Sequence, residues 1–128
     1  MSRHLATICW LLVGAQAALS VTLGFNEDNT LARLGPIISV AVTIAFTALH
    51  GTARYGWYNF AIFFAIAAVV SWIYETASIL TGFPFGHYHY TDRLGPKLWL
   101  VPLAIIPAYF GTAYLAWTIA QVLLGIYA

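Results

Sequence analysis

Charged side chains are scarce in this sequence of 128 residues: five are Lys or Arg, and four are Asp or Glu. They make up 7% of the chain, whereas a soluble domain carries about a quarter. So few charges cannot supply the polar surface of a soluble fold. Hydrophobic residues make up 62%, so lipid is the natural surrounding for this chain. The net charge of +1 provides no basic patch, and nucleic-acid binding is not expected.

Cysteine is almost absent, because the single thiol, Cys9, lies inside an apolar run. One cysteine excludes an internal disulfide and is expected to be a small buried core residue. Several motifs are missing as well. There is no glycine-rich phosphate loop, no Cys-x-x-Cys pair, no nucleophile elbow and no paired acidic motif for magnesium–diphosphate chemistry. These absences argue against nucleotide, flavin and prenyl-transfer functions, and no cofactor is expected.

Apolar segments separated by polar breaks predict an all-α integral membrane bundle, a single domain over residues 1–128 with about four transmembrane helices. The first segment is expected to be a retained helix, because it is long for a signal peptide. Residues 25–33 are polar and predict a loop. Pro102 and Pro107 predict either a kink in the last helix or a short segment leading into it. The predicted helices span about 5–24, 37–50, 57–81 and 98–127, with a structured loop at 82–97.

The order of these segments places their ends on two sides of a membrane. The N-terminus, the break near residues 51–56 and the C-terminus share one side. The loops at 25–33 and 82–97 share the other. Arginine and lysine residues are too evenly divided between the sides to predict which one faces the cytoplasm.

Glu75 is the most informative polar residue, because an ionisable group within a membrane segment costs about 2.5–3.5 kcal/mol on insertion scales. Helical spacing places Ser71, Glu75, Ser78 and Gly82 on one face, which predicts a polar stripe facing the bundle interior or a cavity. A carboxyl group shielded from water suits a general acid. The simpler interpretation is that Glu75 reaches the membrane surface or a basic loop residue.

The loop 82–97 contains the second polar cluster, His87-Tyr88-His89-Tyr90-Thr91-Asp92. In an extended backbone the two histidines point to one side and the two tyrosines to the other. A metal site from this pair with Asp92 and Glu75 is weakly indicated, and no metal is predicted. A polar lid whose His or Asp92 orients a water, or a simple interfacial loop, fits the same residues. His50 is predicted to be interfacial, and Gln16 to form an interhelical hydrogen bond.

Several short stretches together resemble the carotenoid biosynthesis membrane family, which includes the carotenoid 1,2-hydratases such as bisanhydrobacterioruberin hydratase and γ-carotene hydratase. The resemblance covers about residues 71–117. It is carried by Tyr74-Glu75, Thr81–Asp92, Leu94–Lys97 and Val101–Leu103. Members of that family continue with further helices. This chain is therefore expected to be a short member that completes its pocket in a homo-oligomer or a larger membrane complex, a fragment, or a relative that has kept the binding fold without the reaction.

The resemblance implies hydration of the terminal C1=C2 double bond of an acyclic carotenoid end group. Glu75 would be the acid, and Asp92, His87 or His89 would orient the water. The implied substrate-binding residues are Tyr88, Tyr90, Ser71, Ser78 and Phe85. The expected partners are a carotenoid or another isoprenoid lipid and the membrane, most naturally a prokaryotic inner membrane.

Two other classes of function remain open at this point. One is a non-catalytic carotenoid-binding or assembly subunit of a membrane complex, for example a photosynthetic one. The other is a small transporter or proton-relay protein that uses Glu75 and the histidine pair, although no second intramembrane charge supports it.

Overall fold

The computed structural model describes residues 2–25 and 29–126, and most of these residues are helical. Two short strands and one turn of 3-10 helix connect the second and third helices. The elements are α1 (Arg3–Phe25), α2 (Asn29–Thr81), η1 (Asp92–Leu94), β1 (Lys97–Leu98), β2 (Val101–Pro102) and α3 (Ile105–Leu123).

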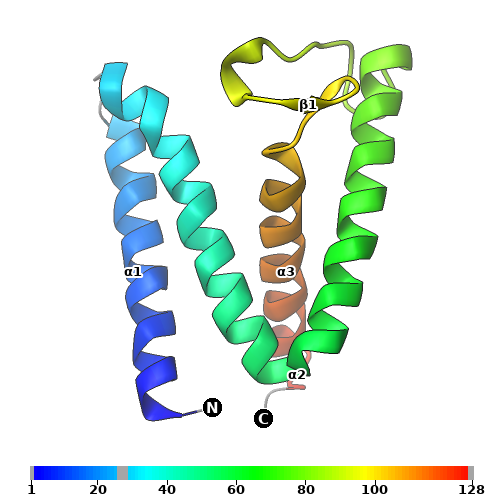
Figure 1. Cartoon of the computed structure of the whole chain (residues 1–128). Coiled ribbons are helices and arrows are strands. Elements are labelled where there is room, and N and C mark those ends of the chain that lie inside the picture. The colour runs from blue at the N-terminus through cyan, green and yellow to red at the C-terminus, as the bar shows by residue number, and fades with distance from the viewer. Residues whose placement is uncertain (1, 26–28, 127–128) are drawn as a thin grey trace.

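Gly56 divides α2 into two legs, residues 29–55 and 57–81, because its φ of 76° and ψ of 162° are not helical. This backbone region is essentially restricted to glycine, which has no Cβ. The legs diverge from Gly56, with α1 beside the first leg and α3 packed against α2 (Figure 1). The start of α1 and the end of α3 lie at the same end of the bundle as the turn between the two legs, whereas the 82–97 loop lies at the opposite end, as predicted (Figure 1).

The helix boundaries match the sequence expectations in part. The predicted helices 5–24 and 57–81 correspond to α1 and the second leg of α2. The first leg is longer than the predicted 37–50, since it spans residues 29–55. The predicted loop 25–33 is therefore wrong for Phe25, the last residue of α1, and for residues 29–33, whereas its residues 26–28 lie outside the described residues.

The predicted fourth helix, 98–127, begins later than expected. Residues 97–102 instead form a two-stranded antiparallel hairpin in which Lys97 pairs with Pro102 and Leu98 with Val101. Pro102 ends this hairpin, a position that tolerates its missing N–H. Pro107 lies in the first turn of α3, where the missing N–H is also tolerated. The sequence from Leu98 to Ala104 is thus a segment that leads into the helix.

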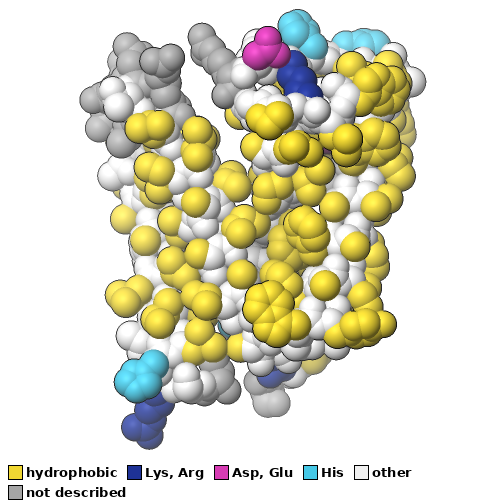
Figure 2. Space-filling model, viewed as in Figure 1, with side chains coloured by type: hydrophobic (Ala, Val, Ile, Leu, Met, Phe, Trp, Pro, Cys, Tyr) yellow, Lys and Arg dark blue, Asp and Glu magenta, His cyan; other side chains and the backbone are white. Residues whose placement is uncertain are grey.

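Polar groups are enriched inside the bundle and apolar side chains outside it, the reverse of a soluble protein. The buried set contains more polar than hydrophobic side chains among the described residues. Large apolar side chains cover much of the visible surface (Figure 2). By length and composition, Arg3–Phe25 and Leu34–Thr81 are able to cross a membrane. These surfaces suit contact with lipid chains.

Small and polar residues join the helices. Gln16 Nε2 donates to Ser39 Oγ over 2.5 Å, which confirms the interhelical hydrogen bond predicted for Gln16. A Cβ atom on Gly111 would lie 2.7 Å from Thr43 Cγ2, so glycine permits α3 to approach the first leg closely. Cys9 is buried, as predicted.

Candidate functional site

Glu75 lies toward the C-terminal end of the second leg, and 2% of its surface is exposed. Three phenol groups donate hydrogen bonds to its carboxyl oxygens. Tyr88 and Tyr90 donate to Oε2, the second over 2.8 Å. Tyr109 donates to Oε1 over 2.5 Å. We call these four residues the glutamate–tyrosine cluster.

Three separate segments of the chain assemble this cluster. Glu75 comes from α2, Tyr109 from the second turn of α3, and the other two tyrosines from the connecting loop. Tyr88 and Tyr90 are two positions apart in the loop, and their rings meet edge to face at 5.5 Å. The predicted alternation is confirmed, because both tyrosines are half-buried while His87 and His89 are exposed.

The predicted polar stripe on α2 faces the interior. Ser71, Glu75 and Ser78 are all buried, and Gly82 is half-buried. Ser78 Oγ accepts a hydrogen bond from the backbone N–H of Phe85 over 3.2 Å, so this serine anchors the start of the loop. The Phe85 ring stacks on Tyr109 at 6.5 Å. Ser71 Oγ donates to the carbonyl of Ala68, within its own helix.

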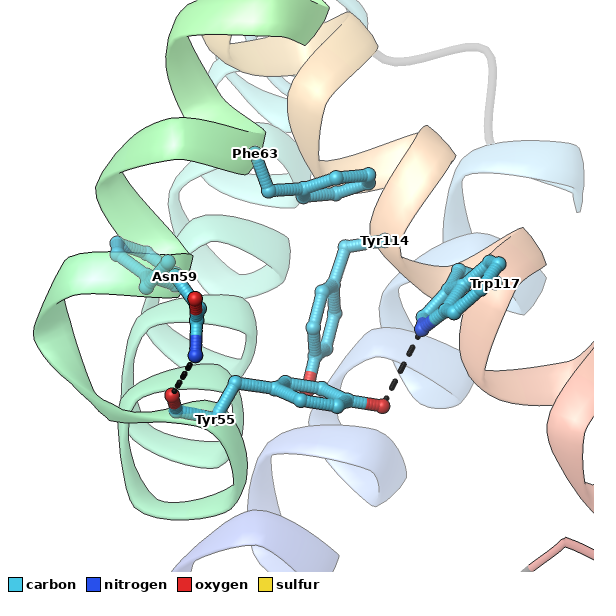
Figure 3. A pocket seen from close by; sticks show the side chains of 6 residues that line it. Tyr55, Asn59, Phe63, Tyr114 and Trp117 are labelled. Carbon is cyan, nitrogen blue, oxygen red and sulfur yellow. Dashed lines mark hydrogen bonds between the residues drawn. The ribbon is translucent and has the colours of Figure 1, made fainter.

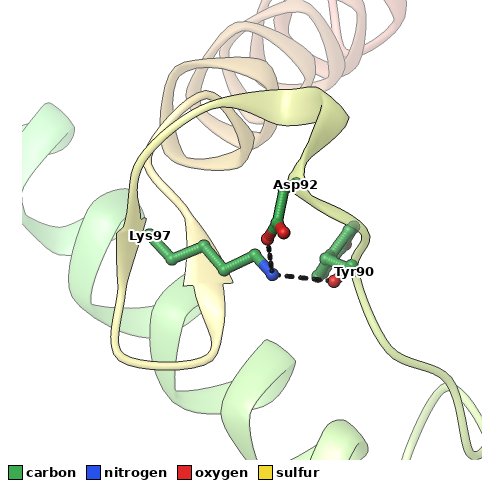
Figure 4. Close-up of polar contacts among 3 residues, drawn as sticks. All are labelled: Tyr90, Asp92 and Lys97. Carbon is green, nitrogen blue, oxygen red and sulfur yellow. Dashed lines mark hydrogen bonds and ion pairs between the residues drawn. The ribbon is translucent and has the colours of Figure 1, made fainter.

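The remaining predicted catalytic residues lie on the outer side of the loop. Asp92 is fully exposed and forms an ion pair with Lys97 Nζ at 3.0 Å (Figure 4). The same ammonium group donates to the carbonyl of Tyr90 over 2.8 Å, which fixes the loop above Glu75. Within residues 2–25 and 29–126, no hydrogen bond or ion pair joins Glu75 to His87, His89 or Asp92.

The described residues also contain no group of three His, Cys, Asp or Glu side chains arranged for a metal ion. His87, His89, Asp92 and Glu75 therefore do not converge into the metal site that was weakly indicated.

The environment of the cluster keeps its loop phenols protonated. Burial, followed by the hydrogen bond to Glu75, raises the pKa of Tyr88 to about 12. The same two causes raise the pKa of Tyr90 further. Both side chains therefore remain hydrogen-bond donors throughout the neutral range.

Tyr109 and Lys97 were not singled out from the sequence, although both position the cluster. A phenol in an apolar helix needs a polar partner, and this could have indicated Tyr109. Lys97 carries one of few charges in the loop, but it returns to Asp92 through the 3-10 turn Asp92–Leu94, which Gly95 closes by donating to the carbonyl of Asp92.

A second polar and aromatic cluster lies near Gly56, at the other end of the bundle. His50 is half-buried, and its Nδ1 atom lies 2.6 Å from Tyr114 Oη. It is therefore bonded within the bundle, whereas the sequence predicted an interfacial residue. Tyr55 donates to Gln121 Oε1 over 2.9 Å, and Trp117 Nε1 donates to Tyr55 Oη over 3.2 Å.

An aromatic cavity of about 160 Å³ adjoins this second cluster, between the second leg and α3 (Figure 3). We call it the aromatic pocket. The residues that line it are Tyr55, Asn59, Phe60, Phe63, Tyr114 and Trp117.

The fold and the glutamate–tyrosine cluster define a class: a helical bundle with an apolar exterior, in which a buried carboxyl group on one helix accepts hydrogen bonds from phenols of a loop and of a second helix. Residues 34–127 match the sequence profile of the family described as Carotenoid biosynthesis protein. The chain belongs to this carotenoid biosynthesis protein family, as the sequence resemblance predicted. Comparisons with curated proteins and with solved structures find no match.

Proposed function

We propose that this chain is an integral membrane enzyme that adds water to the terminal C1=C2 double bond of an acyclic carotenoid. The observation that carries the proposal is the buried Glu75 carboxyl group with phenols on both of its oxygens. The apolar exterior supports placement in a membrane, for which we propose a prokaryotic inner membrane. A long polyene is soluble in the same lipid that surrounds the helices.

The proposed reaction begins with protonated Glu75. Its O–H bond breaks as a C2–H bond forms, and the electron pair of the double bond leaves a tertiary cation at C1. The phenol groups stabilise the carboxylate that remains, because their O–H dipoles point at it. Nearby aromatic ring faces stabilise the cation.

Water then completes the addition. Its oxygen bonds to C1, and the proton that it loses returns to the Glu75 carboxylate, directly or through one of the phenols. We propose that this water enters from the loop side, where His87, His89 and Asp92 are exposed. Tyr88, Tyr90 and Phe85 would hold the end group beneath the loop, with Ser71 and Ser78 shaping the polar wall. The reaction consumes one water and leaves the enzyme unchanged.

Substitution of the acid tests this proposal. A host that makes an acyclic carotenoid should gain pigments heavier by one water per modified end when it expresses the wild-type chain. Glu75→Gln should lower this product by about 100-fold or more, because an amide has no proton to transfer. Tyr74→Phe is the matched control, since Tyr74 lies next to Glu75 but is 48% exposed. Equal product from Glu75→Gln and the control would remove Glu75 from the mechanism.

A non-catalytic carotenoid-binding or assembly subunit is the second candidate. The observation that favours it is that phenols from two segments, the loop and α3, engage both Glu75 oxygens, an arrangement that also serves to fix the loop. For this candidate, the folded wild-type protein should bind a carotenoid whose mass is unchanged in the same host. A homo-oligomer or a larger complex would then be sought by native mass spectrometry.

A further inference from the structure

We infer that the aromatic pocket near Gly56 is a second subsite, which binds the far end of the same linear polyene whose near end reaches Glu75. This inference rests on the proposed function, because it takes the substrate class from it. It adds a binding site, the residues that form it and a preference for rod-shaped molecules.

The pocket has the size and lining of a site for an unsaturated end group. Its volume is about 160 Å³, close to the roughly 150 Å³ of an apolar cavity that binds benzene. It therefore accommodates one branched end of an isoprenoid chain and not the whole molecule. Aromatic rings form most of the wall, with Phe63 and Tyr114 meeting edge to face at 6.3 Å. Such ring faces pack well against a flat polyene.

The pocket and Glu75 lie at opposite ends of one straight element. Phe63 and Glu75 are both on the second leg, about 18 Å apart along its axis at about 1.5 Å per residue. Asn59 at the pocket rim is about 24 Å from Glu75 by the same rise. The whole leg is about 37 Å long, similar to the roughly 30 Å hydrocarbon core of a bilayer. A molecule that occupies both sites must be long, thin and apolar.

Aromatic side chains continue along the seam between the two sites. Phe110 on α3 is 2% exposed and contacts Phe60, Phe63 and Phe64 with ring centroids 5.0–5.7 Å apart. Nearer to Glu75, the seam continues with the stacked rings of Phe85 and Tyr109. A polyene lying along this seam would contact the partly exposed rings of Phe60, Phe63 and Phe64, which Phe110 supports from beneath.

Hydrogen bonds hold the walls of the pocket in place. Tyr114 is bonded to His50, and Tyr55 connects Trp117 with Gln121, so these bonds join the first leg to α3 beside the cavity. Asn59 Nδ2 donates to the carbonyl of Tyr55 at the rim over 2.9 Å (Figure 3). These bonds preorganise the pocket, which lowers the entropic cost of binding.

Retention of the polyene by the purified full chain tests this subsite. The protein is produced in a host that makes a linear acyclic carotenoid, purified in detergent, and analysed by absorbance and mass for bound polyene per chain. Asn59→Trp places a large ring over the pocket from an exposed rim position and should lower retention about fivefold or more. Ile66→Trp, on the same leg but outside the pocket and 58% exposed, should retain the wild-type amount.

A second pair of variants removes a ring instead of adding one. Trp117→Leu takes away part of the wall and should also lower retention, whereas Trp57→Leu removes a more exposed ring outside the lining. Circular dichroism and melting temperature establish that each variant is folded. Equal retention by folded Asn59→Trp and Ile66→Trp would overturn the subsite, as would a wild-type protein that retains no polyene.

The two proposals fail in different ways. Bound polyene that is lost in Asn59→Trp, with no gain of water in any sample, would leave the subsite standing and refute hydration. Hydrated product that forms equally in all variants, with unchanged retention, would support hydration and refute the subsite.

Discussion

At the scale of single residues, the decisive feature is a carboxyl group that is removed from water but not from hydrogen bonding. Glu75 is 2% exposed, and an isolated buried carboxylate would be strongly unfavourable. Tyr88, Tyr90 and Tyr109 replace the water that Glu75 loses. The same bonds connect the loop and α3 to α2, so the cluster contributes to stability as well as to the proposed chemistry.

The pH dependence of stability is a prediction at this scale. The folded-state pKa of Tyr88, about 12, is above its ordinary value of 10.0. Its stabilising contribution should therefore be complete below about pH 10 and disappear as the pH rises through about 12. Tyr88→Phe should lose about 1–3 kcal/mol of unfolding free energy at neutral pH, because Glu75 loses a donor. The difference from the wild type should shrink above pH 10.

Unfolding in detergent micelles between pH 7 and 12 measures this difference. Tyr74→Phe is the control, because Tyr74 lies on the outer face of the same leg. A stability difference for Tyr88→Phe that stays constant up to pH 12 would contradict the raised pKa.

At the scale of elements, the turn at Gly56 determines which residues of α2 meet. It reverses the direction of the chain without a loop, so His50 and Tyr55 on one side and Phe63 on the other converge on Tyr114. The aromatic pocket exists because the legs diverge from this point and α3 packs against them.

Substitution of Gly56 tests whether its backbone conformation requires glycine, because an added Cβ would meet no neighbouring atom there. Gly56→Ala should destabilise the protein by about 1–3 kcal/mol, because alanine disfavours a φ of 76° with a ψ of 162°. Gly14→Ala, within α1 and with open space around the added Cβ, should be neutral or slightly stabilising. Thermal unfolding of both variants in the same detergent compares them, and equal stabilities would show that Gly56 is not under this constraint.

At the scale of the whole molecule, the surface and interior have exchanged their usual compositions. Buried Thr47, Ser71 and Ser78 contrast with exposed Trp10, Phe25 and Ile66. This pattern is stable only where the solvent is apolar. If the second leg crosses the membrane as proposed, the two clusters of polar and aromatic residues lie near its two faces, at the ends of the leg.

Cysteine labelling tests this arrangement directly. In a Cys9→Ala background, Ala53→Cys near the turn and Thr91→Cys in the loop introduce single thiols at exposed positions. A membrane-impermeant maleimide should label them from opposite sides in sealed vesicles of known orientation. Labelling of both from the same side would mean that the second leg does not cross the membrane.

The sequence was sufficient for properties that depend on local pattern and solvent preference. Composition indicated a helical bundle with an apolar surface, and helical spacing placed Ser71, Glu75 and Ser78 on one buried face. Period-two alternation separated the tyrosines from His87 and His89. The family followed from the spacing of glycine, tyrosine and proline around Glu75.

Only the tertiary structure decided which distant groups meet. Tyr109 reaches Glu75 across 34 positions of sequence, and Tyr114 reaches His50 across 64. These contacts depend on the turn at Gly56, on the hairpin before α3 and on the close approach at Gly111. Hydrophobic periodicity reports which side of a helix is buried, but it carries no information about the partner that covers it. The phenols around Glu75 and the pocket at the other end therefore arise from helix packing.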